Sequence, residues 1–507
     1  MGVVKRVAAN AALALGGVLA ALVIAELAMR VAGLSYPTTT TFLRADYYTG
    51  WSHKPGITFP NPVDGLHGFV SFNRYGMRDN REYTIAKPPG TFRIAVIGDS
   101  FAEALQVPQA EDFCSVVERE LARCDGLRGR KIEVLNFGVY GFGTAQELIM
   151  LRRRVLRWSP DLVVLEFYAN DLGDNTRATD DSWSWGPRPY FVLQNGRLTE
   201  DDSFRSAPSI KDNVAAAEWN GRRKLRPGLA PLYGLIINSR VRELIYHFSY
   251  APVVVPFFHL DRWIEHRVFF SPKQEPPPAP GKAAAPPAEP GTLPDARPNH
   301  APASARPASE LEQRFRWEGS LLGPPRQKEW RESWQVTERL IEEIARESHA
   351  HGARFLLMIA DASAQAYPDP ELRRKVLPEP VYLNRRLETL GKRDGFAVLS
   401  LAEPLQRYAD AHHAFLHGVS GYMPGWGHWN VEGHRVVGEL LATEICAMTR
   451  DGQANASSAQ AAPARPRKAH LYRGARRRRV IAPTIASAAR ARSRAPAPAR
   501  DARCAGR

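Results

Sequence analysis

The sequence predicts an α/β protein, a three-layer α/β/α sandwich in which helices cover both faces of a central parallel sheet. Five short apolar runs carry this prediction, and they lie at residues 92–98, 131–136, 161–167, 354–360 and 396–401. Each is followed by a turn and then by residues with helical spacing. Strands that alternate with helices favour a parallel sheet, and strands that are apolar along their whole length favour its buried centre.

Helical periodicity places the covering helices between these runs. Residues 143–158, 326–350, 379–393 and 431–446 repeat apolar side chains every three or four positions. The order is interrupted once, because residues 175–325 separate the third apolar run from the fourth. We therefore expect a large insertion at this point, and insertions of this kind often shape access to a site.

The first residues predict a transmembrane anchor. Residues 7–25 contain no charge, and about 20 apolar residues match the thickness of the hydrocarbon core. Lys5 and Arg6 precede this run, so the positive-inside rule puts the N-terminus in the cytoplasm and the remaining chain outside. A cleaved signal peptide is the alternative, but no small-x-small cleavage site follows. We expect residues 1–34 to be a single-pass anchor in the inner membrane, with a periplasmic domain beyond it.

The amino-acid composition divides the rest of the chain into a lead-in segment, one domain and two stretches rich in Pro and Ala. Residues 35–90 carry turn residues and scattered aromatics, which predicts an irregular lead-in segment before one domain at 91–449. Residues 272–308, inside the insertion, are mostly Pro and Ala, and residues 450–507 are mostly Ala, Arg and Pro. Neither stretch can bury enough apolar surface to offset the entropy of ordering it. We expect both to be disordered.

The net charge of +15 does not by itself indicate a nucleic-acid-binding protein. Much of the excess lies in the tail, for example in the run of four arginines from Arg476 to Arg479. A basic disordered tail is most often simply solvated, although it can contact anionic lipid or nucleic acid. No specific nucleic-acid partner is predicted, and the sequence does not define an oligomeric state.

The four cysteines, Cys114, Cys124, Cys446 and Cys504, have no metal-binding spacing. Cys114 and Cys124 are expected on one helix, where ten residues would separate them by about 15 Å, too far for a disulfide. The cysteines are therefore expected to be ordinary buried or free thiols. No metal site and no cofactor are predicted.

Polar residues follow the predicted strands where a site would form. Asp99 and Ser100 come after the first strand, a Gly-rich turn with Gly141 after the second, and Asn170 after the third. His428 precedes the last helix. Because sites in open α/β sheets gather beyond the carboxyl ends of the strands, we expect these residues to converge.

This set of residue types is what acyl transfer requires. A hydroxyl such as that of Ser100 becomes a nucleophile when a base takes its proton, and His428 is a suitable base near neutral pH. The tetrahedral intermediate needs donors directed at its oxyanion. The backbone N–H groups of Ser100 and Gly141 and the side-chain amide of Asn170 could supply them.

Four segments resemble the conserved blocks of the SGNH (GDSL-like) hydrolase family: VIGDSFAEALQVP, VLNFGVYGFGTAQE, FYANDLGDN and GHWNVEGH. The resemblance covers roughly residues 70–175 and 350–445, and the lead-in resembles bacterial members with an N-terminal membrane helix. It implies a flavodoxin-like fold and activity on acyl esters, thioesters or O-acetylated sugars. It also implies Ser100 as nucleophile and His428 as base, with Gly141 and Asn170 in the oxyanion hole.

One departure from the family concerns the acid that orients the base. In the family an Asp stands two or three residues before the His, but here those positions are Gly425 and Trp426. Three readings remain open. A backbone carbonyl orients His428 in a Ser–His dyad, a carboxylate such as Asp361 or Glu432 substitutes, or the site is degraded. An orienting Asp matters because its loss costs about 10⁴ in rate in a well-studied triad.

The sequence thus predicts a membrane-anchored serine esterase acting on acyl esters outside the cytoplasmic membrane, with O-acetylated cell-surface glycan as a suggested substrate. Two alternatives use the same cleft. A polysaccharide O-acetyltransferase would replace water with a sugar hydroxyl, and a degraded envelope binding domain would no longer catalyse. The insertion is expected to decide specificity.

Overall fold

The computed structural model describes residues 2–31, 42–61, 68–180, 186–207, 310–418 and 424–461, with a few single positions between 210 and 244. The Pro-rich stretch 272–308 and residues 462–507 of the predicted tail lie outside the described residues.

The centre of the protein is a five-stranded parallel sheet, as the sequence predicts. Its strands are β5 (Thr91–Ile97), β6 (Lys131–Asn136), β7 (Leu162–Phe167), β10 (Arg354–Ile359) and β11 (Ala397–Ser400). Their spatial order is β11-β10-β7-β5-β6, and every neighbouring pair is parallel. In chain order this is 2-1-3-4-5, the flavodoxin-like arrangement, in which ligands bind where the order reverses. That point lies at the carboxyl ends of β5 and β7.

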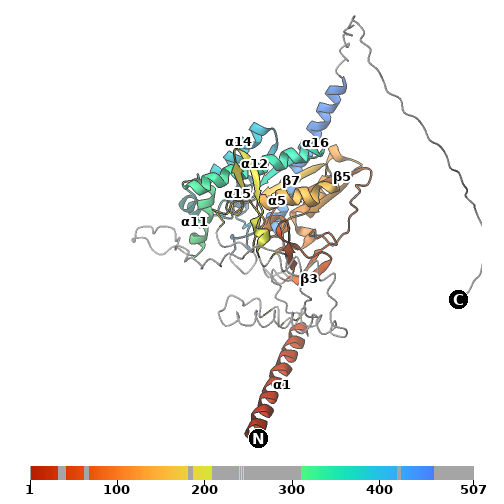
Figure 1. Cartoon of the computed structure of the whole chain (residues 1–507). Coiled ribbons are helices and arrows are strands. Elements are labelled where there is room, and N and C mark those ends of the chain that lie inside the picture. The colour runs from red at the N-terminus through yellow and green to blue at the C-terminus, as the bar shows by residue number, and fades with distance from the viewer. Residues whose placement is uncertain are drawn as a thin grey trace, which may run out of the picture. The chain divides into compact units, whose positions relative to one another are not determined.

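Helices of two separate sets cover the sheet. The helices are α3 (Ser100–Glu103), α4 (Phe113–Leu121), α5 (Thr144–Met150), α6 (Asp171–Asp174), α11 (Glu310–Leu322), α12 (Lys328–Ala350), α13 (Pro370–Val376), α14 (Tyr382–Asp394), α15 (Ala402–His412) and α16 (Val431–Ala461). After α5 the chain continues through a single π turn and a 3₁₀ turn to Trp158. One buried cluster contains side chains of α5, α12 and α14, and the other contains those of α4, α15 and α16. The three-layer sandwich is therefore confirmed (Figure 1).

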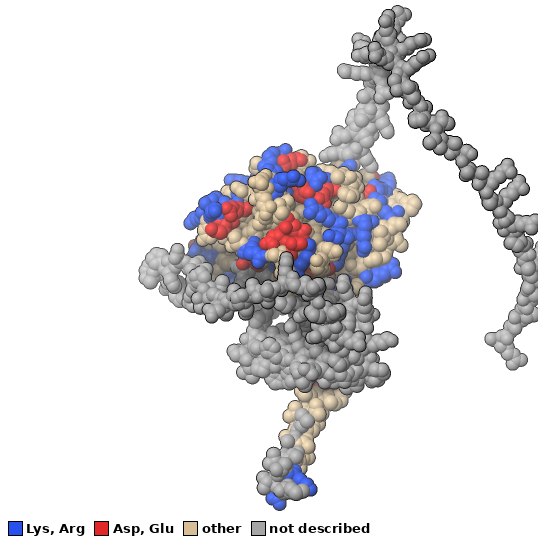
Figure 2. Space-filling view, in the orientation of Figure 1, with Lys and Arg blue, Asp and Glu red and all other residues tan. Residues whose placement is uncertain are grey.

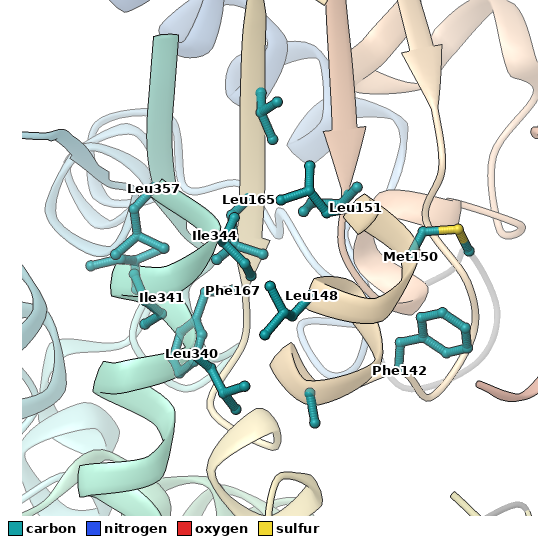
Figure 3. Packing of buried hydrophobic residues seen from close by; sticks show 14 of the residues in the cluster. Phe142, Leu148, Met150, Leu151, Leu165, Phe167, Leu340, Ile341, Ile344 and Leu357 are labelled. Carbon is teal, nitrogen blue, oxygen red and sulfur yellow. The ribbon is translucent and has the colours of Figure 1, made fainter. Parts of the chain in front are cut away.

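The apolar side chains of strand β7 alternate between the two buried clusters. Val163, Leu165 and Phe167 belong to the first cluster, while Leu162 and Val164 belong to the second. Successive side chains of a strand point to opposite faces, so a strand covered on both faces is mostly apolar. The exception in β7 is Glu166, which is buried and accepts a hydrogen bond from the backbone N–H of Asp99 (3.2 Å). Figure 3 shows side chains of α12 facing those of β7 across the first interface.

The N-terminal helix α1 (Gly2–Val31) is long and apolar. Its segment Ala12–Val31 spans 20 residues with a mean hydropathy of 2.2, and among the described helices it alone has the length and composition to cross a membrane. A membrane anchor and a signal sequence share these properties.

The lead-in segment is more regular than the sequence suggests. Strands β1 (Leu43–Asp46) and β2 (Gly50–His53) form one antiparallel pair, and β3 (Ile57–Asn61) and β4 (Gly68–Phe72) form another. The described part of the insertion contains a third pair, β8 (Tyr190–Gln194) with β9 (Arg197–Asp201), and also α11. These strands have four or five residues each, too few for a visible alternating pattern.

The view that all cysteines are free thiols is wrong. Cys124 and Cys446 form a disulfide between residues 322 positions apart, with a Cα–Cα distance of 5.8 Å, and Cys114 is buried and free. Helix α4 ends at Leu121, so Cys124 lies beyond it and faces α16 instead of sharing a helix with Cys114. Spacing along one helix could not reveal a partner on another.

We expect this disulfide to contribute about 2–4 kcal/mol to the free energy of unfolding, because it closes a very long loop in the unfolded chain. A reductant should lower the melting temperature of the wild type and of Cys114→Ala by the same amount. It should have no effect on the double variant Cys124→Ser/Cys446→Ser. Thermal unfolding in detergent, with and without reductant, measures this, and equal sensitivity of all three proteins would contradict it.

On the domain face shown in Figure 2, Lys and Arg alternate with Asp and Glu, with no broad patch of one sign. Many of these charges are paired on the surface, as in the contacts of Arg152 with Glu343 and Glu347. Such exposed pairs contribute little to stability.

Candidate active site

The turn after β5 presents Ser100. The Asp99 side chain accepts a hydrogen bond from the backbone N–H of Phe101 (2.8 Å) and so caps the short helix α3, which begins at Ser100. Asp99 is buried, whereas Ser100 is partly exposed. The cap therefore holds the turn from below and leaves the serine hydroxyl accessible.

His428 lies within hydrogen-bonding distance of this serine. The Nε2 atom of His428 is 2.8 Å from the Oγ atom of Ser100, although the two residues are 328 positions apart. An acceptor nitrogen at this distance can take the hydroxyl proton.

The Gly-rich turn after β6 packs tightly on the serine helix. The side-chain amide of Asn136 donates to the carbonyl of Ala102 (2.7 Å), and its oxygen accepts from the N–H of Gly138 (2.9 Å). A Cβ atom at position 138 would lie 2.4 Å from the backbone nitrogen of Glu103. Gly138 is therefore required for this approach, which brings Gly141 toward Ser100.

Two of the three predicted oxyanion donors are unused in this arrangement. Among the described residues, the N–H groups of Ser100 and Gly141 donate to no protein acceptor. The Asn170 amide lines the same cavity, where it hydrogen-bonds to Asp174 (3.3 Å) and to the Asp99 carboxyl. A set of unused donors beside a nucleophile is suited to an oxyanion.

A cavity of about 230 Å³ joins these groups. Ser100, Gly141, Asn170 and His428 all line it, so the structure brings together the four residues predicted from four separate segments. Two parts of the insertion complete the wall: Arg188 near β8, and Trp317 and Glu318 on α11. Trp330, Trp426 and Leu321 add further apolar surface.

Neither carboxylate considered as an orienting acid contacts His428. Asp361 follows β10, is fully buried, and bonds to His417 (3.0 Å) and to the indole N–H of Trp429 (2.8 Å). Glu432 pairs with Tyr408 and Arg435 on the outer side of α16. Among the described residues no acceptor bonds to the second ring nitrogen of His428, so no backbone carbonyl orients it either.

Asp361 instead holds the backbone on both sides of His428. His417 bridges from Asp361 to the carbonyl of Gly427, with its Nδ1 atom 2.7 Å from that oxygen. Trp429 is bound directly to the other carboxylate oxygen. The backbone N–H of Gly418 also donates to the carbonyl of His428 (2.9 Å). The histidine is thus positioned through its chain neighbours and not through its own ring.

The local packing explains why no acid occupies position 425, the first of the two family positions. Gly425 has φ +85°, and a Cβ atom there would lie 2.5 Å from the ring of Tyr367 and 2.8 Å from that of Phe415. A side chain at this position would be both strained and blocked.

The two histidines have opposite electrostatic character. Both ring nitrogens of His417 face acceptors, an arrangement that only the doubly protonated ring satisfies. Burial alone would lower the pKa of His417, but Asp361 and the Gly427 carbonyl raise it above its usual value. Burial, with the positive charge of His417 as a second cause, lowers the pKa of His428 to about 4. His428 is therefore neutral at pH 7, as a general base must be.

We expect kcat/KM of the wild type to stay level as the pH falls to about 5 and to drop as it passes the His428 pKa of about 4, because protonated His428 cannot accept the serine proton. His417→Gln removes the neighbouring charge. It should move this acid limb upward by about one pH unit, toward the ordinary histidine value. The pH dependence of p-nitrophenyl acetate hydrolysis measures the shift. The exposed His412→Gln is the control, and an unmoved limb in His417→Gln would contradict the electrostatic account.

Carboxylates accumulate beneath the cavity. Burial raises the pKa of Asp99 to about 6 and that of Asp174 to about 7. Hydrogen bonds to both carboxylates, and the charge of Arg188 beside Asp174, lower these pKa values but do not outweigh burial. Burial raises the pKa of Glu147 well above its usual range, and neither of its oxygens has a hydrogen-bond partner. Among the described residues no cluster has the composition of a metal site. Glu147 is therefore uncharged at neutral pH, which limits the negative charge in this region.

Sequence reasoning missed the residues that come from the insertion and the lead-in. Arg188, Trp317 and Glu318 carry no motif, and only their composition, aromatic and charged in a long irregular segment, was visible. Asp174 accepts a hydrogen bond from the Asn170 amide and so braces the loop that carries it.

The sheet and the cavity define an α/β protein with a flavodoxin-like parallel sheet and a Ser–His pair at the carboxyl edge of that sheet. No family model and no curated protein sequence matches the chain. Among solved structures, the chain is similar to the acetyl xylan esterase AlAXEase, with 10% identity and a TM-score of 0.30 over 70% of this chain and 100% of that one.

Two further structures are similar to the same part of the chain. Axe2, an acetylxylan esterase from Geobacillus stearothermophilus, has 10% identity and a TM-score of 0.31 over 70% of this chain and 94% of that one. TesA has 11% identity and a TM-score of 0.28 over 69% and 95%.

Proposed function

We propose that this protein is an SGNH-type serine esterase that cleaves acyl esters, with Ser100 as nucleophile and His428 as base. The observation that carries the proposal is the 2.8 Å contact between Ser100 Oγ and His428 Nε2, in a cavity that Gly141 and Asn170 also line. A hydroxyl, a neutral imidazole and unused N–H donors around one cavity meet the geometric requirements of acyl transfer.

The reaction follows from these positions. Ser100 Oγ attacks the ester carbonyl while its proton passes to His428 Nε2, and the oxyanion accepts hydrogen bonds from the N–H groups of Ser100 and Gly141 and from the Asn170 amide. The C–O bond to the leaving alcohol then breaks, and His428 returns the proton to that alcohol. Water, deprotonated by His428, cleaves the acyl-serine in the same way, releasing the acid.

Because no carboxylate in the described part of the chain bonds to His428, we propose that the site works as a Ser–His dyad. The neighbouring charge of His417 also opposes protonation of His428. We expect a slower enzyme than one with a complete triad, for which the orienting Asp contributes about 10⁴ in rate.

The cavity lining favours an ester of a sugar over a plain long-chain acyl ester. Trp317, Trp330 and Trp426 present aromatic surface beside the serine, and the Trp317 side chain is 45% exposed. Pyranose rings stack on such flat faces. Glu318 and Arg188 lie among the tryptophans and can hydrogen-bond to hydroxyl groups.

Two observations support a location outside the cytoplasmic membrane. The segment Ala12–Val31 is long and apolar enough to be an inner-membrane anchor, and the Cys124–Cys446 disulfide is typical of oxidising compartments. We therefore propose a single-pass protein with a periplasmic catalytic domain.

Activity-based labelling tests the catalytic assignment. The full-length protein in detergent should react with a fluorophosphonate at Ser100, so Ser100→Ala should not be labelled and His428→Ala should be labelled much more slowly. Equal labelling of all three would refute the assignment and would support a binding domain that no longer catalyses.

A second assay separates the hydrolase from the O-acetyltransferase. Incubation with an acetylated xylo-oligosaccharide should release acetate, and added unacetylated oligosaccharide should not capture the acetyl group. If most of the acetyl groups are recovered on the added sugar, the transferase is favoured. Trp317→Ala should raise KM for the oligosaccharide but leave p-nitrophenyl acetate hydrolysis nearly unchanged.

A further inference from the structure

The lead-in segment contacts the parts of the site that follow β5 and β6, and it reaches the loop after β7 through Arg188. Its strand β2 (Gly50–His53) is buried along its whole length, with Trp51 5% and His53 2% exposed. This burial is unusual for a short strand outside the central sheet, and the residues that cover it belong to the catalytic loops.

Trp51 determines the direction of an oxyanion donor. Its indole N–H donates to the carbonyl oxygen of Tyr140 (2.9 Å). That carbonyl and the N–H of Gly141 belong to the same planar peptide unit and point in opposite directions. A hydrogen bond that fixes the carbonyl therefore also fixes the line along which Gly141 donates.

The same indole reaches the Asn170 donor through a short chain of contacts. The Arg188 guanidinium lies 5.1 Å from the centre of the Trp51 ring and forms an ion pair with Asp174 (2.8 Å). Asp174 in turn accepts from the Asn170 amide. Loss of the Trp51 contact would thus loosen two of the three donors.

His53 holds the other side of the site. Its Nε2 atom bonds to the carboxylate of Glu103, the last residue of the helix that begins at Ser100, and both side chains are about 1% exposed. Its Nδ1 atom lies 2.9 Å from the carbonyl oxygen of Gly76, and its ring stacks on Phe72. The ring is therefore fixed on three sides.

A third contact joins Thr49, the residue before β2, to the Gly-rich turn after β6. The Gln146 side chain donates to the carbonyl of Thr49 (2.7 Å) and accepts from the N–H of Gly143 (3.2 Å). It ties the residue before β2 to the end of the turn that carries Gly141.

We propose that β2 is a positioning element of the active site, in which Trp51 directs the Gly141 N–H and His53 fixes the serine helix. This proposal rests on the function proposed above. Under this proposal the lead-in segment, which precedes the domain at 91–449 in the sequence, helps to position the groups of the active site.

Trp51→Phe in the full-length protein tests the proposal, since it keeps the aromatic ring and removes the N–H. We expect kcat for p-nitrophenyl acetate to fall about 10- to 100-fold, as for a displaced catalytic group. KM should stay within about two-fold, because the donor acts on the transition state. The rate of fluorophosphonate labelling should fall in parallel.

Trp158→Phe is the matched control. Trp158 is also fully buried, but its indole nitrogen has no hydrogen-bond partner, so its replacement removes the same atoms without freeing a carbonyl. This variant should keep the wild-type kcat. If both variants keep it, or if both lose activity in proportion to lost folded protein, the proposal is overturned.

His53→Gln provides a second test should Trp51→Phe fail to fold. Its kcat should fall about 10-fold with KM unchanged, and an unchanged kcat would count against the proposal. The two hypotheses fail in different ways. If labelling does not depend on Ser100, the proposed function is wrong. If labelling depends on Ser100 but the β2 variants turn over normally, the positioning role alone is wrong.

Discussion

His428→Gln is expected to lower kcat for p-nitrophenyl acetate by about 10²- to 10⁴-fold. Removing the base of a complete triad costs about 10⁶, of which the orienting Asp accounts for a large share. That share is already missing here, since no described carboxylate bonds to His428. Gln keeps much of the side-chain volume but cannot take the serine proton at neutral pH.

Non-additivity is the sharper criterion for this pair. Ser100→Ala should reduce kcat as much as His428→Gln does, and the double variant should be no slower than either, because the two residues act as one unit. Initial-rate kinetics on folded, detergent-solubilised protein measures all three. A double variant slower by the product of the single effects would show that Ser100 and His428 act independently, contrary to the proposed dyad.

Asn170→Ala is expected to lower kcat by about 10²- to 10³-fold. In the proposed mechanism its amide donates to the oxyanion, and removal of one such donor typically costs about 3–4 kcal/mol of barrier. KM should change little, since the donor is directed at the oxyanion and not at the ground-state carbonyl. Steady-state kinetics with p-nitrophenyl acetate separates the two constants.

Asp174→Asn is the companion variant for this prediction. It keeps an oxygen that can accept from Asn170, while it removes the charge that faces Arg188. It should therefore lose far less activity than Asn170→Ala. If Asn170→Ala changed KM with kcat intact, Asn170 would bind substrate and would not stabilise the transition state.

Four strands of the central sheet could be predicted almost to the residue because they are buried along nearly their whole length, whereas the edge strand β11 is only partly buried. The apolar run at 161–167 and the observed β7 (Leu162–Phe167) differ by one residue. Such strands carry their position in composition alone, and parallel pairing then places their carboxyl ends at one edge. This is why the sequence predicts that Ser100, Asn170 and His428 lie near one another.

Other features could not be predicted because they depend on contacts across the fold. The partner of Cys124 lies 322 residues away on a different helix. Asp361 follows a strand, which made it a candidate, but whether it meets His428 or His417 depends on the loop at 416–429. Trp317 and Glu318 reach the cavity only because α11 folds back over it. None of these is marked by spacing or periodicity.

The disulfide has a consequence for how the protein is made. Cys446 lies after the last strand of the sheet, so its bond with Cys124 cannot form until nearly the whole domain has been synthesised. In the proposed location, the chain would emerge from the membrane with Cys124 unpaired for more than 300 residues of export. During that interval Cys114 is the only other exported cysteine, so a periplasmic oxidant that joins cysteines in the order in which they appear would form the wrong Cys114–Cys124 pair. Correct maturation would then require that Cys114 become buried early, or that an isomerase exchange the disulfide.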